Sequence, residues 1–531
     1  MKLLRTLSVV MLVALIGLAA VPLADAGNPA GKDALYLAIG GERENGYDPT
    51  LGWGRYGSPL FQSTLLRRDE NLNVVNDLAE EVSLSDDRLV WTVKIREDAK
   101  FSDGQPVTAA DVAFTFNQAL KSGGVVDLAG MEVATATGEY TVEIRLKKPQ
   151  STFLNRLITL GIVPEHAYSE NYARNPIGSG PYKLVRWDEG QQLIVEANPY
   201  YYGEKPQLER LVFLFMDEDT AFAAAKAGQV QVVAVPQALA IQQVPGMTIH
   251  PVESVDNRGI MFPMQPASGK TTADGYPIGN NVTADRAIRQ AINYAIDRQA
   301  LVDGVLEGFG SVAYGPVSKL PWEEPAAAVQ DGDLEKARQI LAEGGWADAN
   351  GDGVVEKEGL DATFTLVYPA GDATRQALAL AVADMIGEIG IRADVQGKSW
   401  DDIQKLKHSN AVLFGWGSHD QTEMYNLYHS SMGGVEWYNP GFYSNPIVDA
   451  YLDQAMAAAS EAEAIPFWKK AQWDGETGFT AKGDAAWAWL VNLNHTYFVD
   501  NCLDVGQSQV EPHGHGWPIT ANIAKWKWTC K

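Results

Sequence analysis

Strand-like and helical stretches follow one another through most of this chain. Val90–Ile95 alternates apolar and polar side chains with period 2, as a half-buried strand does. Asp285–Leu306 and Arg375–Ile389 instead repeat apolar residues at helical spacing. A chain of 531 residues is too long for one hydrophobic core. The alternation therefore predicts an α/β fold divided into more than one lobe.

The N-terminus has the three parts of a secretory signal peptide. Lys2 and Arg5 precede an apolar run at residues 7–21, and Ala24-Asp25-Ala26 offers a cleavage site of the A-x-A type. The run of 15 residues is shorter than the roughly 20 that span a bilayer, although an uncleaved membrane anchor is the alternative. We therefore expect residues 1–26 to be removed and the mature protein to be exported to the periplasm.

The chain has two cysteines, Cys502 and Cys530, both near its C-terminal end. In an oxidising compartment two such residues are expected to pair and to tie the C-terminal tail to the body of the protein. A metal site built on them is the alternative, which the long gap and the lack of a C-x-x-C spacing disfavour.

The charge balance limits the kind of partner. Lys and Arg number 42 against 67 Asp and Glu, which gives a net charge of −25. Nucleic acid and anionic membranes require clustered positive charge, so neither is expected as a partner. A cationic or metal-bearing small ligand is compatible with this charge.

The motifs of common enzyme classes are absent from the sequence. It contains no G-x-S-x-G, H-E-x-x-H, Walker P-loop or strand-linked G-x-G-x-x-G motif, and no carboxylate pair stands out as a glycosidase acid and base. We therefore expect no catalytic residue, no catalytic cofactor and no enzymatic activity. A secreted enzyme or a sugar-binding module is the alternative of a different class.

Histidines gather in the last quarter of the chain. Six of the eight lie beyond residue 400, namely His408, His419, His429, His495, His513 and His515. Imidazole is a favoured ligand of nickel, copper and zinc, yet a single histidine is more often a hydrogen-bonded structural residue. A second metal-like pattern, residues 348–352 (DANGD), begins like an EF-hand loop but has Gly359 where a bidentate Glu is required. We interpret it as a turn stabilised by Asp and Asn side chains.

Several motifs together resemble family 5 of the periplasmic solute-binding proteins, the peptide, nickel and opine receptors of ABC importers. In the family's order, and over nearly the whole mature chain, they are Leu89–Arg96 (LVWTVKIR), Phe101–Val112 (FSDGQPVTAADV), Gly178–Tyr182 (GSGPY), Asn198–Tyr201 (NPYY) and Asp285–Ile292 (DRAIRQAI). The resemblance implies a periplasmic binding protein-like fold of cluster C type. This fold is α/β, with two main lobes, an extra lobe and the ligand in the cleft between lobes.

The resemblance also implies how the chain is divided and what it does. Lobe I would take residues 27–70, 180–258 and 496–531, lobe II residues 71–179 and lobe III residues 259–495. The ligand would lie between lobes I and III and be enclosed by a hinge closure. The closed form would deliver it to a membrane permease driven by an ATPase, and we expect the receptor to act as a monomer.

Within the family, the motifs favour the nickel and metallophore receptors. Peptide receptors typically carry an acidic W-x-x-D-x-x-D-P-D-type loop, whereas residues 416–428 here retain Asp420 but lack the D-P-D element. The segments that look like the nickel and metallophore receptors are 254–259, 279–283, 494–497 and 513–518. These receptors take up Ni(II) as a chelate with histidine or an opine-type carrier. We therefore expect a chelate of nickel or another divalent metal as the ligand, with a di- or oligopeptide as the alternative.

Candidate ligand contacts follow from the same resemblance. They are Tyr56, Arg258, Arg375, Trp416, His419 and Tyr425, with His495 as the metal ligand. Trp416 matches a pocket tryptophan, and Arg375 is the candidate for a chelator carboxylate. Because neutral imidazole is the ligating form, binding through His495 should weaken below about pH 6. The basic residues that some nickel receptors have after the first helix of lobe II are missing from residues 121–127, so a bis-histidine-like complex is expected rather than a highly anionic chelator.

Overall fold

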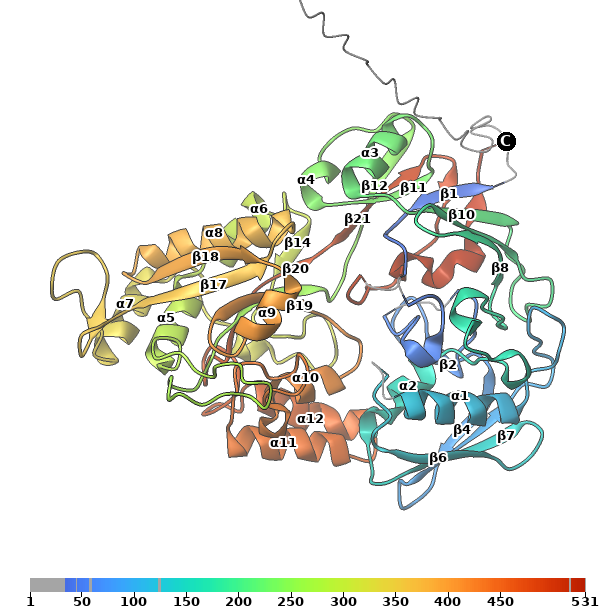
Figure 1. Cartoon of the computed structure of the whole chain (residues 1–531), viewed down its shortest axis with the longest axis horizontal. Coiled ribbons are helices and arrows are strands. Elements are labelled where there is room, and N and C mark those ends of the chain that lie inside the picture. Colours follow the sequence, from blue (N-terminus) through green and yellow to red (C-terminus); the bar gives the residue numbers. More distant parts are fainter. Residues whose placement is uncertain (1–33, 44, 57–59, 123–125, 515–516, 531) are drawn as a thin grey trace, which may run out of the picture.

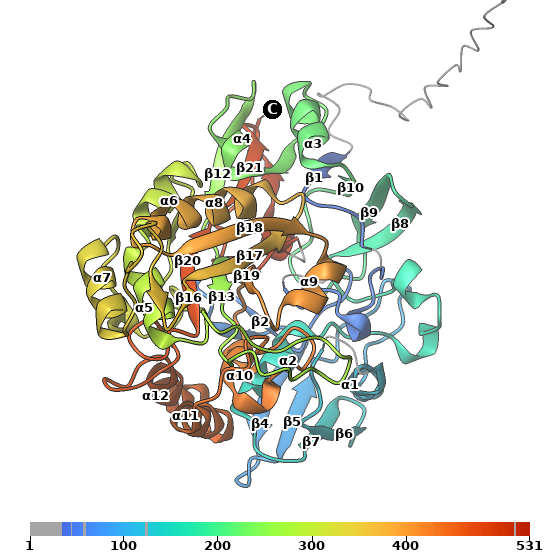
Figure 2. The same ribbon diagram turned by 60° about the vertical axis from the view of Figure 1, so that its left-hand side comes forward.

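The computed structural model describes residues 34–43, 45–56, 60–122, 126–514 and 517–530. The predicted signal peptide lies outside these described residues. Within the described part of the chain, no helix combines the length and apolar character needed to cross a membrane. The three largest sheets, each packed against helices or loops, define the three lobes that Figures 1 and 2 show around a common centre.

Lobe I is built on a seven-stranded sheet in the order β12-β21-β11-β1-β10-β9-β8. The strands are β1 (Leu35–Ala38), β8 (Tyr182–Asp188), β9 (Gln192–Ala197), β10 (Arg210–Leu214), β11 (Val232–Val235), β12 (Met247–Val252) and β21 (His495–Asp500). β1 runs parallel to both of its neighbours, and β21 lies antiparallel between β11 and β12. The sheet thus takes strands from three separate parts of the chain; the lobe boundaries themselves stay a prediction.

Both faces of this sheet are covered, because its central strands are apolar on both sides. Leu35 and Leu37 pack into a cluster with Trp517, whereas Ala38 faces the opposite cluster around α3 (Glu218–Lys226). The short helix α4 (Gln237–Ala240) follows β11. A strand buried on both faces reads as a continuous apolar run, as β11 (VVAV) does.

Lobe II contains a four-stranded antiparallel sheet in the order β4-β5-β7-β6. Its elements are β4 (Ala79–Leu84), β5 (Val90–Ile95), β6 (Met131–Ala136), β7 (Thr141–Leu146), α1 (Ala109–Ser122) and α2 (Leu154–Thr159). α1 begins where Thr108 donates through its backbone N (2.9 Å) and its hydroxyl (2.8 Å) to the Asp111 carboxylate. The buried face of α1 and the alternating inward residues of β5 form one core.

Lobe III is built on a six-stranded sheet in the order β14-β20-β13-β19-β17-β18. The strands are β13 (Asn257–Met261), β14 (Gly310–Val312), β17 (Thr363–Pro369), β18 (Arg392–Lys398), β19 (Ala411–Trp416) and β20 (Trp487–Leu493). β17 runs parallel to β18 and β19, so all three end at the same edge of the sheet. This edge faces the centre of the molecule, where α9 lies in Figure 2.

The helices of lobe III cover both faces of its sheet. They are α5 (Arg286–Ala295), α6 (Arg298–Gly304), α7 (Leu334–Glu343), α8 (Ala373–Gly387), α9 (Trp400–Leu406), α10 (Thr422–Tyr428), α11 (Pro446–Ala457) and α12 (Glu461–Gln472). The single helix predicted at 285–306 is wrong, because the chain breaks into α5 and α6. Ile296 has extended backbone angles, and the Asp297 carboxylate starts α6 by accepting from Ala300 N at 2.9 Å.

Short elements complete the described chain. The paired strands are β2 (Leu66–Arg68) with β3 (Val74–Asn76), β15 (Glu356–Lys357) with β16 (Leu360–Asp361) and β22 (Leu503–Asp504) with β23 (Lys527–Trp528). The 3₁₀ segments are Pro49–Leu51, Ser151–Phe153, Glu165–Ala167, Tyr172–Arg174, Pro325–Ala327, Ser430–Met432 and Pro518–Lys525. The EF-hand-like segment forms a turn, with Asp348 accepting from the backbone N of Gly351 (2.7 Å) and Gly353 (3.0 Å).

Lobes I and III are joined by two neighbouring chain passages, residues 253–256 and 493–495, which we call the crossover. Leu493 N donates to Asp256 O at 2.8 Å, and Ser254 Oγ donates to Leu493 O at 2.5 Å. The C-terminal segment, residues 509–513, lies alongside them. Its Glu511 O accepts from Val255 N at 2.8 Å. Three passages of chain therefore meet between the two lobes.

Cys502 and Cys530 form a disulfide that closes a loop across the β22–β23 pair, with a sequence separation of 28 residues. We expect Cys502→Ser/Cys530→Ser to lower the free energy of unfolding by about 3 kcal/mol, because the cross-link restricts the unfolded chain. Urea unfolding of the variant and of the wild type, each with and without reductant, measures the effect. Reductant should change only the wild-type midpoint, and equal midpoints for all four samples would contradict this.

Candidate ligand-binding site

A cavity of about 240 Å³ lies where the three lobes meet. Lobe I contributes the loop around Tyr56 and strand β2, lobe II contributes α2, and lobe III contributes the loop after β19. Its polar and aromatic lining includes Arg55, Tyr56, Arg67, Arg68, Asn155, Arg156, Tyr201, Trp416, His419, Asp420, Glu423 and Tyr438. The cavity therefore mixes charges of both signs with aromatic walls.

The loop at residues 416–420 begins at the last residue of β19, and the carboxyl ends of strands are where open α/β sheets bind ligands. Trp416 N donates to Asn257 Oδ1 of the neighbouring strand at 3.0 Å, which holds the start of the loop. Gly417 has φ +142°, and a Cβ there would lie 2.3 Å from Val255 O of the crossover. Only glycine lets the loop pass this close to the crossover.

His419 stands on the cavity wall as a neutral imidazole. Burial, and secondly the Arg68 charge, lowers the pKa of His419 to about 3, against a smaller opposite effect of the Val510 backbone. Its Nε2 is buried and has no hydrogen-bond partner among the described residues. A lone pair without a partner in such a place is unfavourable unless a ligand uses it.

An ion pair between lobes II and III closes one side of the cavity. Arg156 Nη1 lies 2.7 Å from Asp420 Oδ2, and the two side chains are 10% and 14% exposed. Asn155 Nδ2 donates to the other carboxylate oxygen at 3.1 Å, and Arg156 Nε donates to Asp127 O at 2.8 Å. Asp420, the residue retained from the acidic peptide-receptor loop, is therefore already neutralised by lobe II.

Glu423 is a second carboxyl group on the cavity wall, in the first turn of α10. Burial and the neighbouring charge of Asp420 raise the pKa of Glu423 to about 8, against the opposing hydrogen bond from Gly417 N at 3.2 Å. No Lys, Arg or His within the described ranges forms an ion pair with it. Glu423 is thus a mainly protonated group that can donate a hydrogen bond to a ligand at neutral pH.

Arginines from lobe I supply the positive side of the cavity. Arg68 Nη2 donates to Asn155 Oδ1 at 3.0 Å and to His419 O at 3.3 Å, so it joins all three lobes. Arg67 lines the cavity with an exposed side chain and makes no ion pair or side-chain hydrogen bond to another described residue. The cavity therefore has positive charge from lobe I, although the basic residues that some nickel receptors have after the first helix of lobe II are missing from this chain.

Three of the predicted ligand contacts line this cavity: Tyr56, Trp416 and His419. Burial raises the pKa of Tyr56 to about 12, so its phenol stays protonated. Trp416 lies 6.2 Å from Tyr438, ring centre to ring centre, and its Nε1 has no partner among the described residues. These side chains, together with Tyr201, give the cavity its aromatic walls.

The other three predicted contacts lie elsewhere. Arg258 and Arg375 lie next to Gly415, where an added Cβ would be 2.5 Å from Arg258 Nη1 and 2.9 Å from Arg375 Nη2. Arg258 forms an ion pair with Asp256, and Arg375 forms one with Asp372. Tyr425 faces away on α10, with its ring stacked on His429 at 4.4 Å. These side chains were predicted from motif position, which does not show the direction in which a side chain points.

His495 does not have the environment of a metal ligand. Its Nδ1 lies 2.6 Å from Glu511 Oε2 and its Nε2 lies 3.2 Å from Asp256 Oδ2, so both ring nitrogens are occupied. Among the described residues, no group of three or more His, Cys, Asp or Glu side chains is arranged to hold a metal ion. The predicted metal ligation by His495 is therefore not supported by this arrangement.

The fold and the cavity between its lobes are those expected of a solute-binding receptor. The model of the bacterial extracellular solute-binding proteins, family 5, matches residues 73–438. The chain belongs to this family, which works with ABC permeases. It is 31% identical to Protein XP55 from Streptomyces lividans over 502 residues, which cover 91% of this chain and 88% of that one.

Two solved structures illustrate the range of the family. NikZ from Campylobacter jejuni in complex with Ni(L-His) is 25% identical, with a TM-score of 0.79 and coverage of 94% of this chain and 100% of that one. AppA from Bacillus subtilis in complex with a nonapeptide is 26% identical, with a TM-score of 0.71 and coverage of 94% and 99%. This chain is thus the solute-binding component of an ABC transporter, and its relatives are receptors rather than enzymes.

Proposed function

We propose that this receptor captures a small chelate of a divalent metal, such as nickel bound by histidine or an opine-type carrier, in the periplasm. The observation that carries the proposal is His419. It offers a neutral imidazole on the cavity wall, with a ring nitrogen that no described residue uses. A metal already wrapped by small chelators has few open positions, so one protein imidazole is enough.

The size and charge of the cavity support a small ligand that carries carboxylates. Its volume of about 240 Å³ lies below the range of roughly 300–1,000 Å³ typical of small-molecule sites. Arg67 is available for a chelator carboxylate, and a guanidinium can bind such a group through two parallel hydrogen bonds. Trp416 and Tyr438 supply the apolar enclosure around the chelate.

A dipeptide is the second candidate, and Glu423 favours it. When ionised, this unpaired carboxyl group can hold an ammonium group, and AppA shows that a family member binds a peptide. The two candidates differ in what they require of His419: a chelate needs its nitrogen lone pair, whereas a peptide does not.

Thermal stability of metal-stripped protein distinguishes the candidates. We expect stabilisation by Ni(II) and L-histidine together, and not by either alone or by a dipeptide mixture. At about 100 times its dissociation constant a ligand adds roughly 2.7 kcal/mol. Stabilisation by dipeptides alone would reject the chelate and leave a peptide receptor.

His419→Gln should weaken binding of the nickel–histidine complex on the order of 100-fold, because it removes the protein's metal ligand and keeps a polar side chain. The matched control is His429→Gln, a histidine of the same lobe that stacks on Tyr425 away from the cavity. Isothermal titration of both variants measures the effect. Equal affinities for the two variants would remove His419 from the metal.

The pH dependence of this effect separates His419 from an ordinary histidine. Because its pKa is lowered to about 3, His419 stays neutral throughout the range from pH 5.5 to 8. The affinity ratio of wild type to His419→Gln should therefore be constant over this range, since the pH chemistry of the chelate itself cancels in the ratio. A ratio that falls below about pH 6.5 would show that His419 titrates as an unperturbed imidazole.

A further inference from the structure

A second cluster of ionisable side chains lies at the crossover, outside the cavity lining. It consists of Asp256, His495, Glu511 and His513, with side-chain exposures of 4%, 13%, 1% and 14%. The four residues come from all three passages of chain that meet between lobes I and III. We call this cluster the crossover clasp.

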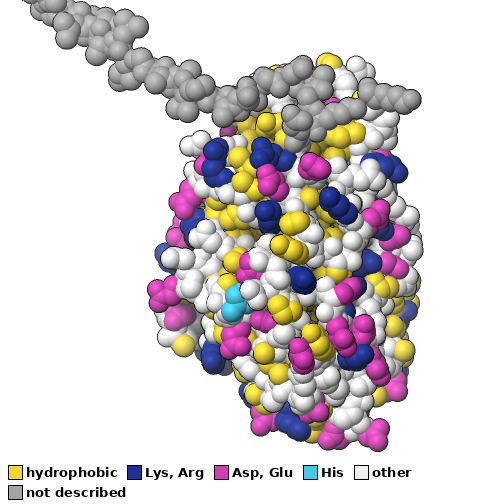
Figure 3. Space-filling view, turned by 90° about the vertical axis from the view of Figure 1, so that its right-hand side faces the viewer, with side chains coloured by type: hydrophobic (Ala, Val, Ile, Leu, Met, Phe, Trp, Pro, Cys, Tyr) yellow, Lys and Arg dark blue, Asp and Glu magenta, His cyan; other side chains and the backbone are white. Residues whose placement is uncertain are grey.

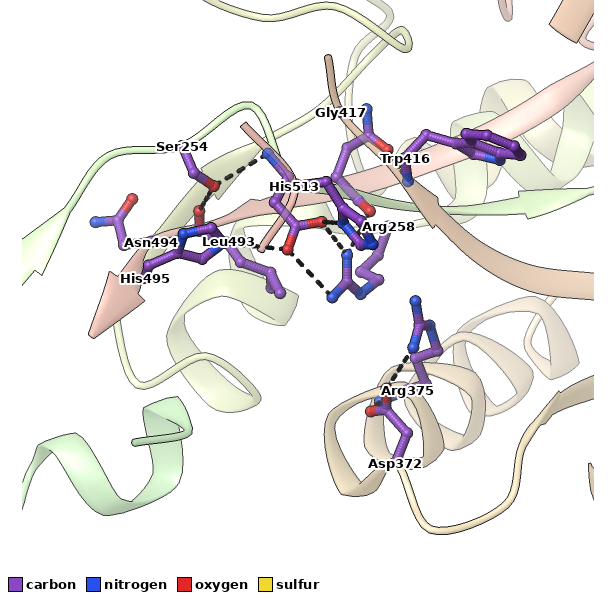
Figure 4. A network of polar contacts seen from close by, with 12 residues as sticks. Ser254, Arg258, Asp372, Arg375, Trp416, Gly417, Leu493, Asn494, His495 and His513 are labelled. Atoms are coloured by element: carbon purple, nitrogen blue, oxygen red, sulfur yellow. Dashed lines mark hydrogen bonds and ion pairs between the residues drawn. The ribbon is translucent and has the colours of Figure 1, made fainter. Parts of the chain in front are cut away.

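Asp256 is the centre of the clasp. His513 Nδ1 lies 2.5 Å from its Oδ1, and His495 Nε2 lies 3.2 Å from its Oδ2 (Figure 4). Arg258 Nη1 also donates to Oδ1, at 2.5 Å. On its other side His495 contacts Glu511, which in turn accepts from the Tyr497 hydroxyl at 2.9 Å.

The charges of the clasp and of its neighbour Arg258 balance only when His495 is protonated. Asp256 and Glu511 bring two negative charges, and the Arg258 guanidinium brings one positive charge. Burial lowers the pKa of His513, which therefore stays neutral and can still donate its Nδ1 proton to Asp256. The second positive charge must come from His495, whose two ring nitrogens both face carboxylate oxygens.

The groups around His495 favour its protonated form, as this charge balance requires. Burial alone would lower its pKa, but the hydrogen bonds and charges of Asp256 and Glu511 outweigh burial and raise the pKa of His495 to about 9. The next charged groups are Arg375, paired with Asp372 on α8, and Glu423, which feels the Asp256 charge. His250 on β12 feels the charge of Glu511, and burial lowers its pKa.

The clasp is connected to two walls of the cavity through His513. The backbone N of His513 donates to Gly417 O at 2.8 Å, within the loop that carries Trp416 and His419. The His513 ring also packs against the Tyr56 ring in a T-shaped arrangement, with ring centres 6.1 Å apart. A displacement of His513 would therefore move cavity walls that belong to both lobe I and lobe III.

We propose that His495 is a positioning residue whose protonated form fastens the C-terminal segment to the crossover and so holds the cavity walls of lobes I and III together. Loss of its proton would leave one buried carboxylate without a counter-charge, and the clasp would loosen. Ligand capture should then weaken as the pH rises, which is the opposite of the dependence expected for an imidazole that ligates a metal. This inference needs no particular ligand.

The first test is direct titration of His495 in the ligand-free protein. Histidines labelled with ¹³C are followed by NMR from pH 5 to 10, and the His495 signal is assigned from its absence in His495→Gln. We expect a midpoint well above pH 7, and a lower midpoint in Glu511→Gln, which removes one of the two carboxylates. A His495 midpoint near 6.5 in the wild type would overturn the proposal.

The second test measures the crossover itself. Hydrogen–deuterium exchange of peptides covering residues 253–257 and 509–514 is compared with that of peptides from lobe II, which correct for the intrinsic effect of pH. We expect exchange at the crossover to rise about tenfold more than in lobe II between pH 7.5 and 9.5, and this difference to be reduced in Glu511→Gln at pH 9.5. An equal rise in both regions would mean that the proton on His495 does not hold the crossover together, and would overturn the proposal. Both tests work without ligand, so their failure is distinct from a failure of the chelate proposal.

Discussion

Arg156→Met should lower the free energy of unfolding by about 3–5 kcal/mol, because it leaves the Asp420 carboxylate buried without its counter-charge. The ion pair has an N–O distance of 2.7 Å, and both side chains are almost closed off from solvent. It also joins lobe II to lobe III, so its loss removes a contact between lobes as well as a charge. Arg156 lines the cavity, and weaker ligand capture should accompany the loss of stability.

Urea unfolding of two controls isolates the buried charge. Arg210→Met breaks an exposed pair with Glu196, which has a similar distance of 2.5 Å but side chains 48% and 35% exposed, and should cost less than about 1 kcal/mol. Arg156→Met/Asp420→Asn removes the carboxylate charge and should recover much of the stability lost in the single variant. A double variant no more stable than Arg156→Met would show that packing, and not charge, explains the effect.

The parts of the fold that depend on local pattern were predictable from the sequence. The strand expected at Val90–Ile95 is β5, residue for residue, because its alternation reflects one buried face. The break between α5 and α6 was missed because apolar spacing continues through Ile296 and outweighs the capping signal of Asp297. On the face that Figure 3 shows, Lys and Arg side chains are interspersed among Asp and Glu.

Site residues were predictable from the sequence only where their position in a motif is enough to place them at the cavity. Trp416 is the last residue of β19 and His419 lies shortly after it, and this placement brings both to the cavity. Arg156 was missed because its partner, Asp420, is 264 positions away, and no local pattern records a contact between lobes. Likewise, a sequence cannot show that the two nitrogens of His495 are already occupied, since Glu511 and Asp256 reach it from different passages of the chain.

Gly417→Ala should weaken ligand capture on the order of 100-fold. The residue has φ +142°, which L side chains rarely adopt, and the new Cβ would lie 2.3 Å from Val255 O. The strain and the displaced backbone together cost about 3 kcal/mol, close to 100-fold in an equilibrium constant. The displaced backbone lies between the crossover and the loop that carries Trp416 and His419. The substitution should therefore disturb the contact between lobes I and III more than the fold of either lobe.

The matched control is Gly371→Ala, which carries the same substitution in lobe III at φ +93° but meets no atom within 4 Å. It experiences the unfavourable backbone angle without the steric contact and should leave capture of the nickel–histidine complex within a few-fold of wild type. Isothermal titration gives the affinities, and hydrogen–deuterium exchange at residues 253–257 reports on the crossover if the complex does not bind. Equal behaviour of the two variants would mean that the loop tolerates movement against the crossover. A selective effect at Gly417 would instead show that contact between the loop and the crossover holds the cavity in its binding form.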